Sequence, residues 1–176
     1  ILIQSAMVNR NDQLKPEILR HISIKQLDDE KSVFIFYLYE KNKEVLEKHY
    51  QLMAPLLINR VHELLNQGFT NDYMALGIRQ YLRNLQSNRY DSLTIAFLES
   101  IYQVYPSMEG IDFALLEIIR YHKSKGDYGH LIDLLTLNNV ERFKMTDEAV
   151  VYLLDQKAIG QATEILFHLG IDKVEE

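Results

Sequence analysis

Apolar residues recur along most of this chain at the three- and four-residue spacing of an amphipathic helix, and short polar segments separate the periodic stretches. Three of the clearest stripes are Leu57, Val61, Leu64 and Leu65; Met74, Ile78, Tyr81, Leu82 and Leu85; and Leu115, Ile118, Ile119 and His122. The pattern predicts an all-α protein of about nine or ten helices. Because the links between them are short, we predict a single domain over residues 1–176.

Residues that cap or interrupt helices mark the predicted boundaries in the first half of the chain. Pro16 suits a first helical position, where its missing N–H costs nothing. Ser32 follows a polar break and is expected to cap the next helix. Pro55 is expected to open a new helix or to kink the existing one, and Gly68 is expected to end it.

The same rules predict the boundaries in the second half. Pro106 should stop one helix and Gly126 should end another. The residues expected to act as N-caps are Thr70 or Asn71, Asp91 or Ser92, Asp112 and Asp127. The last three helices are expected after Asp127, after Thr146 and from Ala158 to Leu169.

One segment fits two kinds of structure. Val33 to Tyr39 is a run of seven apolar or aromatic residues, which suits a buried strand as well as a buried helix. No other segment resembles a partner strand, and a lone strand would leave its backbone groups unpaired. We therefore expect a buried helix.

Composition supports a helical fold and excludes several function classes. The chain has only 7 Gly and 3 Pro, which is few for an all-β protein. It has no Cys, so disulfides, Cys-ligated zinc and Cys nucleophiles are excluded. The net charge is −6, whereas nucleic-acid-binding domains usually carry an excess of basic residues, so no direct contact with nucleic acid is expected.

No membrane association is expected, because no stretch approaches the roughly 18 apolar residues of a membrane helix. Ile1 to Arg10 is apolar but short and has no charged leader, so we expect a cytoplasmic protein. The chain begins with Ile rather than Met, which is consistent with a piece of a longer protein.

The turn at Lys125-Gly126-Asp127-Tyr128 joins two predicted helices spanning Phe113 to Leu137. This turn, the small residue Ala162, and Asn88-Arg89-Tyr90 followed by Phe97 and Pro106 resemble tetratricopeptide-like helical repeats. Equivalent positions at Leu93, Leu131 and Ala162 lie 38 and 31 residues apart, whereas the family keeps a period of about 34. The resemblance therefore implies a degenerate, irregular stack of helical hairpins, an α-solenoid with a right-handed superhelical form.

Few residues suggest chemistry. The six histidines are His21, His49, His62, His122, His130 and His168, and no two are spaced i, i+4. His122 lies on an apolar stripe and is expected to be a core histidine rather than a ligand. No glycine-rich phosphate cradle or nucleophile elbow occurs. We expect no catalytic residues, no metal and no cofactor, and predict a protein that is not an enzyme.

A second face of the helix after Asp112 carries Leu116, Arg120 and Lys123 at spacings of four and three residues. In stacked hairpins such a face can line a concave groove, so these three residues are the candidate peptide-binding site. An ordinary solvated face is the alternative. The leading hypothesis is a protein- or peptide-binding scaffold module. The alternatives are the peptide-sensing half of a bacterial transcriptional regulator and an all-α enzyme with an unrecognised site.

Overall fold

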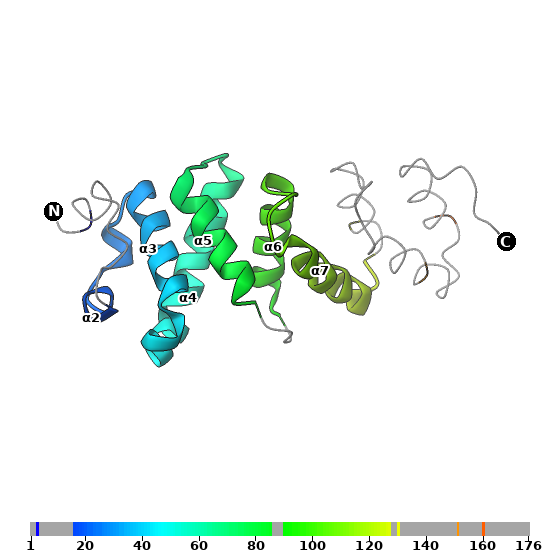
Figure 1. The fold of residues 1–176 in the computed structure, drawn as a ribbon. Helices are drawn as coiled ribbons and strands as arrows, with labels where there is room; N and C mark the ends of the chain where they lie inside the picture. The colour runs from blue at the N-terminus through cyan, green and yellow to red at the C-terminus, as the bar shows by residue number, and fades with distance from the viewer. Residues whose placement is uncertain are drawn as a thin grey trace. The chain divides into compact units, whose positions relative to one another are not determined.

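A computed structural model describes residue 3, residues 16–85 and 90–127, and the single residues 130, 151 and 160. Within residues 16–85 and 90–127 all regular secondary structure is helical, which confirms the all-α prediction for that part (Figure 1). The elements are α2 (Pro16–Leu19), the 3-10 helix η1 (Ile24–Gln26), α3 (Asp29–Lys41), α4 (Lys43–Asn66), α5 (Asp72–Arg83), α6 (Ser92–Val104) and α7 (Ile111–Lys125).

The described part thus contains six α-helices and one 3-10 helix. Most of the residues predicted to form the last three helices lie outside this part. Contacts between residues divide the chain into two compact units, Ile1–Gln86 and Ser87–Glu176. The sequence also predicts a turn at Ser87-Asn88-Arg89-Tyr90, and all of it except Tyr90 falls outside the described residues. The prediction of a single domain stays a prediction.

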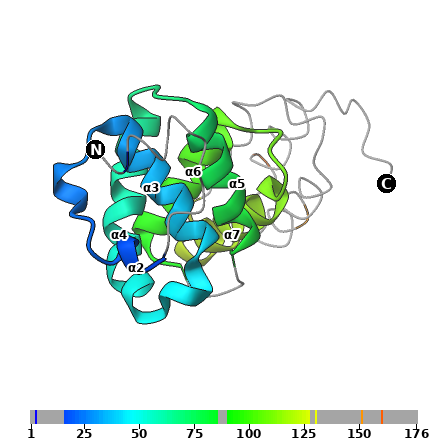
Figure 2. The ribbon, with the colours of Figure 1, turned by 60° about the vertical axis from the view of Figure 1, so that its left-hand side comes forward.

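The centre of the first unit is α3, which contains the apolar run from Val33 to Tyr39. The prediction of a buried helix is confirmed, because every residue of this run except Tyr37 is buried. The helix packs against both α4 and α5, and it lies beside them in two views (Figure 1, Figure 2). Burial on nearly all sides explains why the run shows no polar face.

The predicted cap of this helix was wrong by four positions. Asp28 is the N-cap, and its Oδ1 accepts the backbone N–H of Lys31 at 2.9 Å. The hydroxyl of Ser32 instead donates to the carbonyl oxygen of Asp28 at 2.8 Å. Asp29 and Glu30 then occupy the first turn, where negative charge is favourable. The polar segment therefore begins the helix rather than separating two helices.

The interruption of α4 lies at Glu47, whose φ of 45° and ψ of −118° are not helical. Pro55 lies inside the helix, so the predicted boundary was placed eight residues too late. Tyr39 and Glu40 hydrogen-bond to His49 and Tyr50 respectively, each ten residues further along. The chain therefore folds back between α3 and the main part of α4, and the break at Glu47 lies within that reversal.

Gly68 ends α4 as predicted. Its φ is 76°, its N–H donates to the carbonyl of Leu65 at 2.9 Å, and the Phe69 N–H donates to Leu64 at 2.9 Å. These two bonds form the Schellman arrangement that commonly ends helices. Glycine is favoured here because the left-handed conformation is strained for other residues.

Replacing Gly68 with alanine tests this end. A Cβ at Gly68 would meet no atom within 4 Å, so the backbone conformation alone decides the result. We expect Gly68→Ala to lower the free energy of unfolding by about 1–2 kcal/mol. Gly68→Asn should cost less, because Asn tolerates this conformation better. Equal unfolding midpoints for wild type and Gly68→Ala in urea would contradict the assignment.

Helix ends elsewhere follow the predicted residues with one exception. Asn71 and Asp91 are N-caps. Their Oδ1 atoms accept the backbone N–H groups of Met74 and Thr94 respectively, each at 2.8 Å. The helix before Pro106 ends at Val104. Asp112 was the wrong cap, because α7 already begins at Ile111. Its carboxylate lies in the first turn instead, where it still favours the helix electrostatically.

In the second unit α6 packs against α7. Both helices carry buried apolar residues, among them Phe97, Leu98, Ile101, Leu115 and Ile118. Gly126 follows α7 with a φ of 70°, which confirms that it ends the helix. This pair of helices carries Glu99 and His122, two of the three side chains of the candidate site.

Candidate functional site

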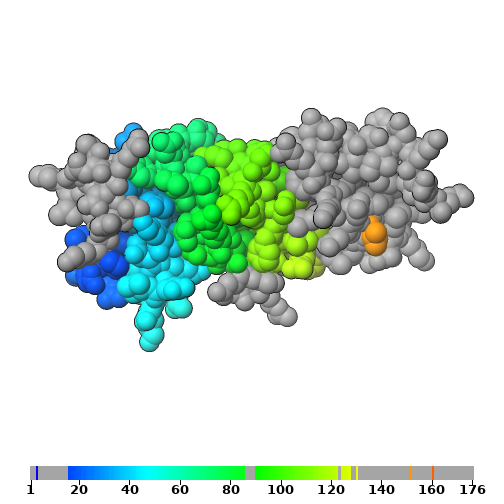
Figure 3. Space-filling view, viewed as in Figure 1, coloured from blue at the N-terminus to red at the C-terminus, as the bar shows by residue number. Residues whose placement is uncertain are grey.

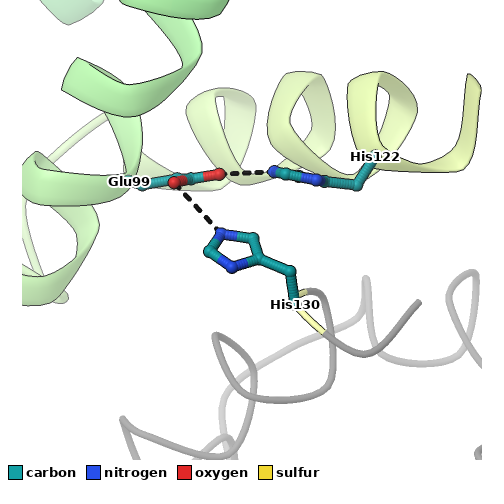
Figure 4. Close-up of side chains that lie close together, drawn as sticks. All are labelled: Glu99, His122 and His130. Atoms are coloured by element: carbon teal, nitrogen blue, oxygen red, sulfur yellow. Dashed lines mark hydrogen bonds and ion pairs between the residues drawn. The ribbon is translucent and has the colours of Figure 1, made fainter. Parts of the chain in front are cut away.

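Three side chains from different segments of the second unit converge beside the end of α7. Glu99 comes from α6, His122 from the last turn of α7, and His130 from the helical residue beyond the turn at Gly126 (Figure 4). We call them the Glu99–His122–His130 cluster. One ligand-capable atom from each residue lies within 4.8 Å of the other two.

The carboxylate of Glu99 joins the two imidazoles. Its Oε1 lies 2.5 Å from Nε2 of His122, and its Oε2 lies 3.2 Å from Nε2 of His130 (Figure 4). The histidine rings are also close, with centroids 4.6 Å apart. The side chains of His122 and Glu99 are 10% and 15% exposed and that of His130 is 44% exposed, so the cluster opens to solvent on one side.

The turn after α7 brings His130 back toward His122. Gly126 adopts a left-handed conformation, and the N–H of Asp127 donates to the carbonyl of His122 at 3.1 Å. Asp127 Oδ1 accepts the backbone N–H of His130 at 3.4 Å, as expected for the predicted N-cap. The turn therefore places two histidines eight positions apart on the same carboxylate.

The second ring nitrogen of His122 has an unusual environment. Nδ1 is buried and has no hydrogen-bond partner within the described part of the chain. Oδ2 of Asp127 lies 3.7 Å from it, and the Asp127 side chain is about half exposed. A buried ring nitrogen without a hydrogen-bond partner is costly, so this nitrogen is a point where the cluster is incomplete.

His122 is a buried histidine, as the sequence predicts, but only its Nε2 is satisfied. The sequence does not reveal the cluster because its three members lie on different segments and show no ligand spacing within one helix. A signal was present, since His122 and His130 flank the predicted turn at Gly126-Asp127. Glu99, which lies 23 residues before His122, could be added only from the packing of α6 on α7.

The predicted peptide-binding residues lie on α7. Leu116 is half-buried, and Arg120 is exposed. The Arg120 Nη1 lies 2.6 Å from Oε1 of Glu117, whose side chain is only 6% exposed. This pair neutralises a buried carboxylate, so Arg120 already has a structural role. The side chain of Lys123 lies outside the described part, and the groove stays a prediction.

A second polar centre lies in the first unit around Glu40, which is 2% exposed. The hydroxyl of Tyr50 donates to Oε1 at 2.5 Å, and Nδ2 of Asn84 donates to Oε2 at 3.1 Å and to the backbone oxygen at 2.8 Å. Burial raises the pKa of Glu40, and these hydrogen bonds and the charge of Lys43 oppose the rise. The centre links the ends of α3 and α5 to α4.

An exposed apolar surface lies in the middle of α4. Leu52 and Leu56 are 72% and 51% exposed, and Pro55 between them is also exposed. Their spacing of three and four residues places them on one side of the helix, and we call them the α4 apolar strip. Figure 3 shows α4, in cyan, reaching the surface of the first unit.

Comparison with known proteins gives no assignment: no protein-family model, curated protein or solved structure matches this chain. Among the helices of the described residues, none combines the length and the apolar character needed to cross a membrane. The function of this chain is therefore inferred from the geometry of these sites.

Proposed function

We propose that this chain is a non-enzymatic helical module that binds a protein or peptide partner through the α4 apolar strip. The observation that supports the proposal is the exposure of Leu52 and Leu56 on one face of a helix whose opposite face is buried. Burying such side chains in an interface is favourable, since each large aliphatic side chain contributes roughly 1.5–3 kcal/mol when removed from water.

The finer architecture belongs to the same proposal. An irregular stack of tetratricopeptide-like hairpins is supported by the packing of α6 on α7 and by the turn at Gly126 and Asp127. Stacked hairpins expose helix faces that suit binding of extended or helical segments. A cytoplasmic location remains a prediction of the sequence.

The charge pattern around the strip suits an interface. Residues 49–59 contain no charged side chain, while Lys48 and Arg60 stand at the two ends. Interface cores are typically depleted of charge and surrounded by a polar rim. Arg60 is already paired with Asp29 and Glu63, which leaves the exposed Lys48 as the rim cation suited to a partner.

We therefore commit to one kind of partner, the apolar face of an amphipathic helix that carries an acidic residue near one end. Its aliphatic side chains would pack between Leu52, Pro55 and Leu56, in the way that ridges of one helix fill grooves of another. Its carboxylate would face Lys48. This pairing would influence orientation and association rate more than affinity.

Selection from a displayed library of amphipathic helical peptides tests the proposal. Selected peptides should bind the wild-type chain and lose at least about tenfold in affinity with Leu52→Lys or Leu56→Lys, roughly 1.4 kcal/mol. The matched control is Val104→Lys, which charges a similarly apolar residue that is 37% exposed in the other unit. Binding by fluorescence anisotropy should be unchanged in that variant.

Two outcomes would contradict this function. One is a selection that yields no binder, or binders insensitive to both α4 substitutions. The other is a wild-type dimer in sedimentation velocity that Leu52→Lys converts to monomer, because the strip would then join two copies of this chain. Circular dichroism should show that all three variants remain folded, as expected for exposed positions.

A further inference from the structure

We propose that the Glu99–His122–His130 cluster is a binding site for a divalent transition-metal ion, with Zn²⁺ as the ion it fits best. The donors are two imidazole Nε2 atoms and one carboxylate oxygen, contributed by α6, α7 and the single helical residue His130 beyond Gly126. Imidazole favours Zn²⁺ and its neighbours, whereas Mg²⁺ and Ca²⁺ prefer sites made only of oxygen.

The spacing of the donors agrees with such an ion. Zinc binds imidazole nitrogen and carboxylate oxygen at about 2.0–2.2 Å, so neighbouring ligands of a tetrahedral ion lie about 3.3–3.5 Å apart. The distance from Glu99 Oε2 to His130 Nε2 is 3.2 Å, close to that value. The other oxygen of Glu99, Oε1, lies 2.5 Å from Nε2 of His122, so a bound ion requires the carboxylate and this ring to separate slightly.

That separation falls on the carboxylate of Glu99, and His130 can follow the movement of the carboxylate. His130 is 44% exposed and belongs to the residues beyond the turn, so its ring can rotate without opening the core. His122 is held in the last turn of α7 and is the fixed ligand. Three protein ligands leave one position of a tetrahedral ion for water on the exposed side.

Asp127 supplies a second, independent observation. A histidine that binds metal through Nε2 carries a proton on Nδ1, and that N–H is usually held by a carboxylate or carbonyl. In this structure Nδ1 of His122 is buried without a hydrogen-bond partner among the described residues, and Oδ2 of Asp127 lies 3.7 Å from it. A small movement of the half-exposed Asp127 side chain completes the carboxylate–histidine–metal arrangement.

The competing explanation is a purely structural cluster, in which Glu99 accepts a hydrogen bond from each imidazole and no metal is involved. That explanation accounts for both contacts of the Glu99 carboxylate. It leaves Nδ1 of His122 unexplained, because neither contact needs a carboxylate on that side of the ring. The two explanations differ in whether the metal-free chain takes up Zn²⁺ with one-to-one stoichiometry.

The test uses the whole chain, without a histidine tag and stripped of metal by chelation. Zn²⁺ alone is titrated in competition with a chromophoric chelator, and Co²⁺ is titrated separately for its absorption spectrum. We expect one high-affinity site and the intense visible bands of tetrahedral cobalt. Glu99→Gln and His130→Gln should each weaken Zn²⁺ binding by more than about 100-fold, exceeding the loss of an outer-shell partner.

Asp127→Asn tests whether the carboxylate beside His122 supports metal binding, without disturbing the turn. Asn is as good an N-cap as Asp, so the turn should persist, while the negative charge facing His122 is lost. We expect Zn²⁺ affinity to fall by roughly 10- to 100-fold. His21→Gln is the matched control, because His21 is an exposed histidine in the other compact unit, and its affinity should equal that of wild type.

His130 is the decisive position because its exposure makes His130→Gln compatible with folding, which circular dichroism would verify. The proposal is overturned by three results: no stoichiometric Zn²⁺ uptake, equal affinity in wild type and His130→Gln, or a cobalt spectrum typical of a fully hydrated ion. Loss of binding in His130→Gln with retention in His21→Gln supports it.

Discussion

Gly77→Ala is expected to destabilise the first unit, even though alanine is normally the better helix former. Gly77 lies inside α5, where it faces α3. An added Cβ would lie 2.7 and 3.0 Å from Cδ1 and Cε1 of Phe36 and 3.3 Å from Cα of Tyr37. Phe36 is 1% exposed and Tyr37 contributes a backbone atom, so neither can yield easily. Gly77 therefore sets how closely the two helices approach.

The size of the effect follows from two opposing contributions. Overpacking a buried contact costs about 1–3 kcal/mol. The higher helix propensity of alanine offsets up to about 1 kcal/mol of that cost. We expect a net decrease of roughly 1–2 kcal/mol in the free energy of unfolding. Urea denaturation followed by circular dichroism measures it.

Gly160→Ala is the matched control. Gly160 is also helical and exposed, and a Cβ placed there would meet no atom within 4 Å. Only helix propensity should act, so this variant should gain up to about 1 kcal/mol in stability. If Gly77→Ala proved as stabilising as Gly160→Ala, the close approach of α3 and α5 would be wrong.

The second large effect concerns the buried carboxylate of Glu40. Tyr50→Phe removes the hydroxyl that donates to Oε1, and hydrogen bonds to charged groups contribute about 1.5–3 kcal/mol. Because this bond favours the ionised carboxylate, its loss should raise the pKa of Glu40 further. The destabilisation should therefore be largest in alkaline solution and smaller in acid, where Glu40 is protonated in the wild type as well.

Glu40→Gln isolates the pH dependence. Burial raises the pKa of Glu40 in the folded state above its ordinary value of 4.5, so the folded state binds the proton more tightly than the unfolded state. The stabilising effect of protonation is fully present below about pH 4.5 and is lost as the pH rises through the raised pKa. The stability of wild type relative to Glu40→Gln should thus decrease with rising pH.

Other carboxylates do not confuse this comparison. Hydrogen bonds from Lys31 and Thr94 lower the pKa values of Asp28 and Asp91, so these groups lose their stabilising effect as the pH falls. Both occur in wild type and in Glu40→Gln, and their contributions cancel in the difference. Chemical denaturation from pH 4 to pH 9 measures it. A pH-independent difference would contradict the assignment of a buried, desolvated carboxylate.

Helix identity was predictable because it depends on local pattern. The run from Val33 to Tyr39 was placed in a helix by the absence of a strand partner, and the described residues contain no strand. Exact boundaries were harder. Asp28 caps α3 in place of Ser32, and α7 begins before Asp112, because several neighbouring polar residues can each act as a cap.

The break in α4 shows where local rules fail. Pro55 was the only local signal for an interruption, yet the non-helical residue is Glu47. Its position follows from the pairing of Tyr39 with His49 and of Glu40 with Tyr50, which requires the chain to reverse before residue 49. No propensity of Glu47 itself indicates a positive φ.

The sequence by itself determined three properties of the described part of the chain: its helical structure, the residues at which most of these helices end, and the burial of His122. These properties depend on spacing within about one helical turn, which the order of residues records directly. Only the tertiary structure decided that Gly77 touches Phe36 and that Glu99 meets His122 and His130. These tertiary contacts depend on how helices cross and on how a turn directs the next segment. No periodic pattern in the sequence indicates them, because the residues lie far apart in the chain.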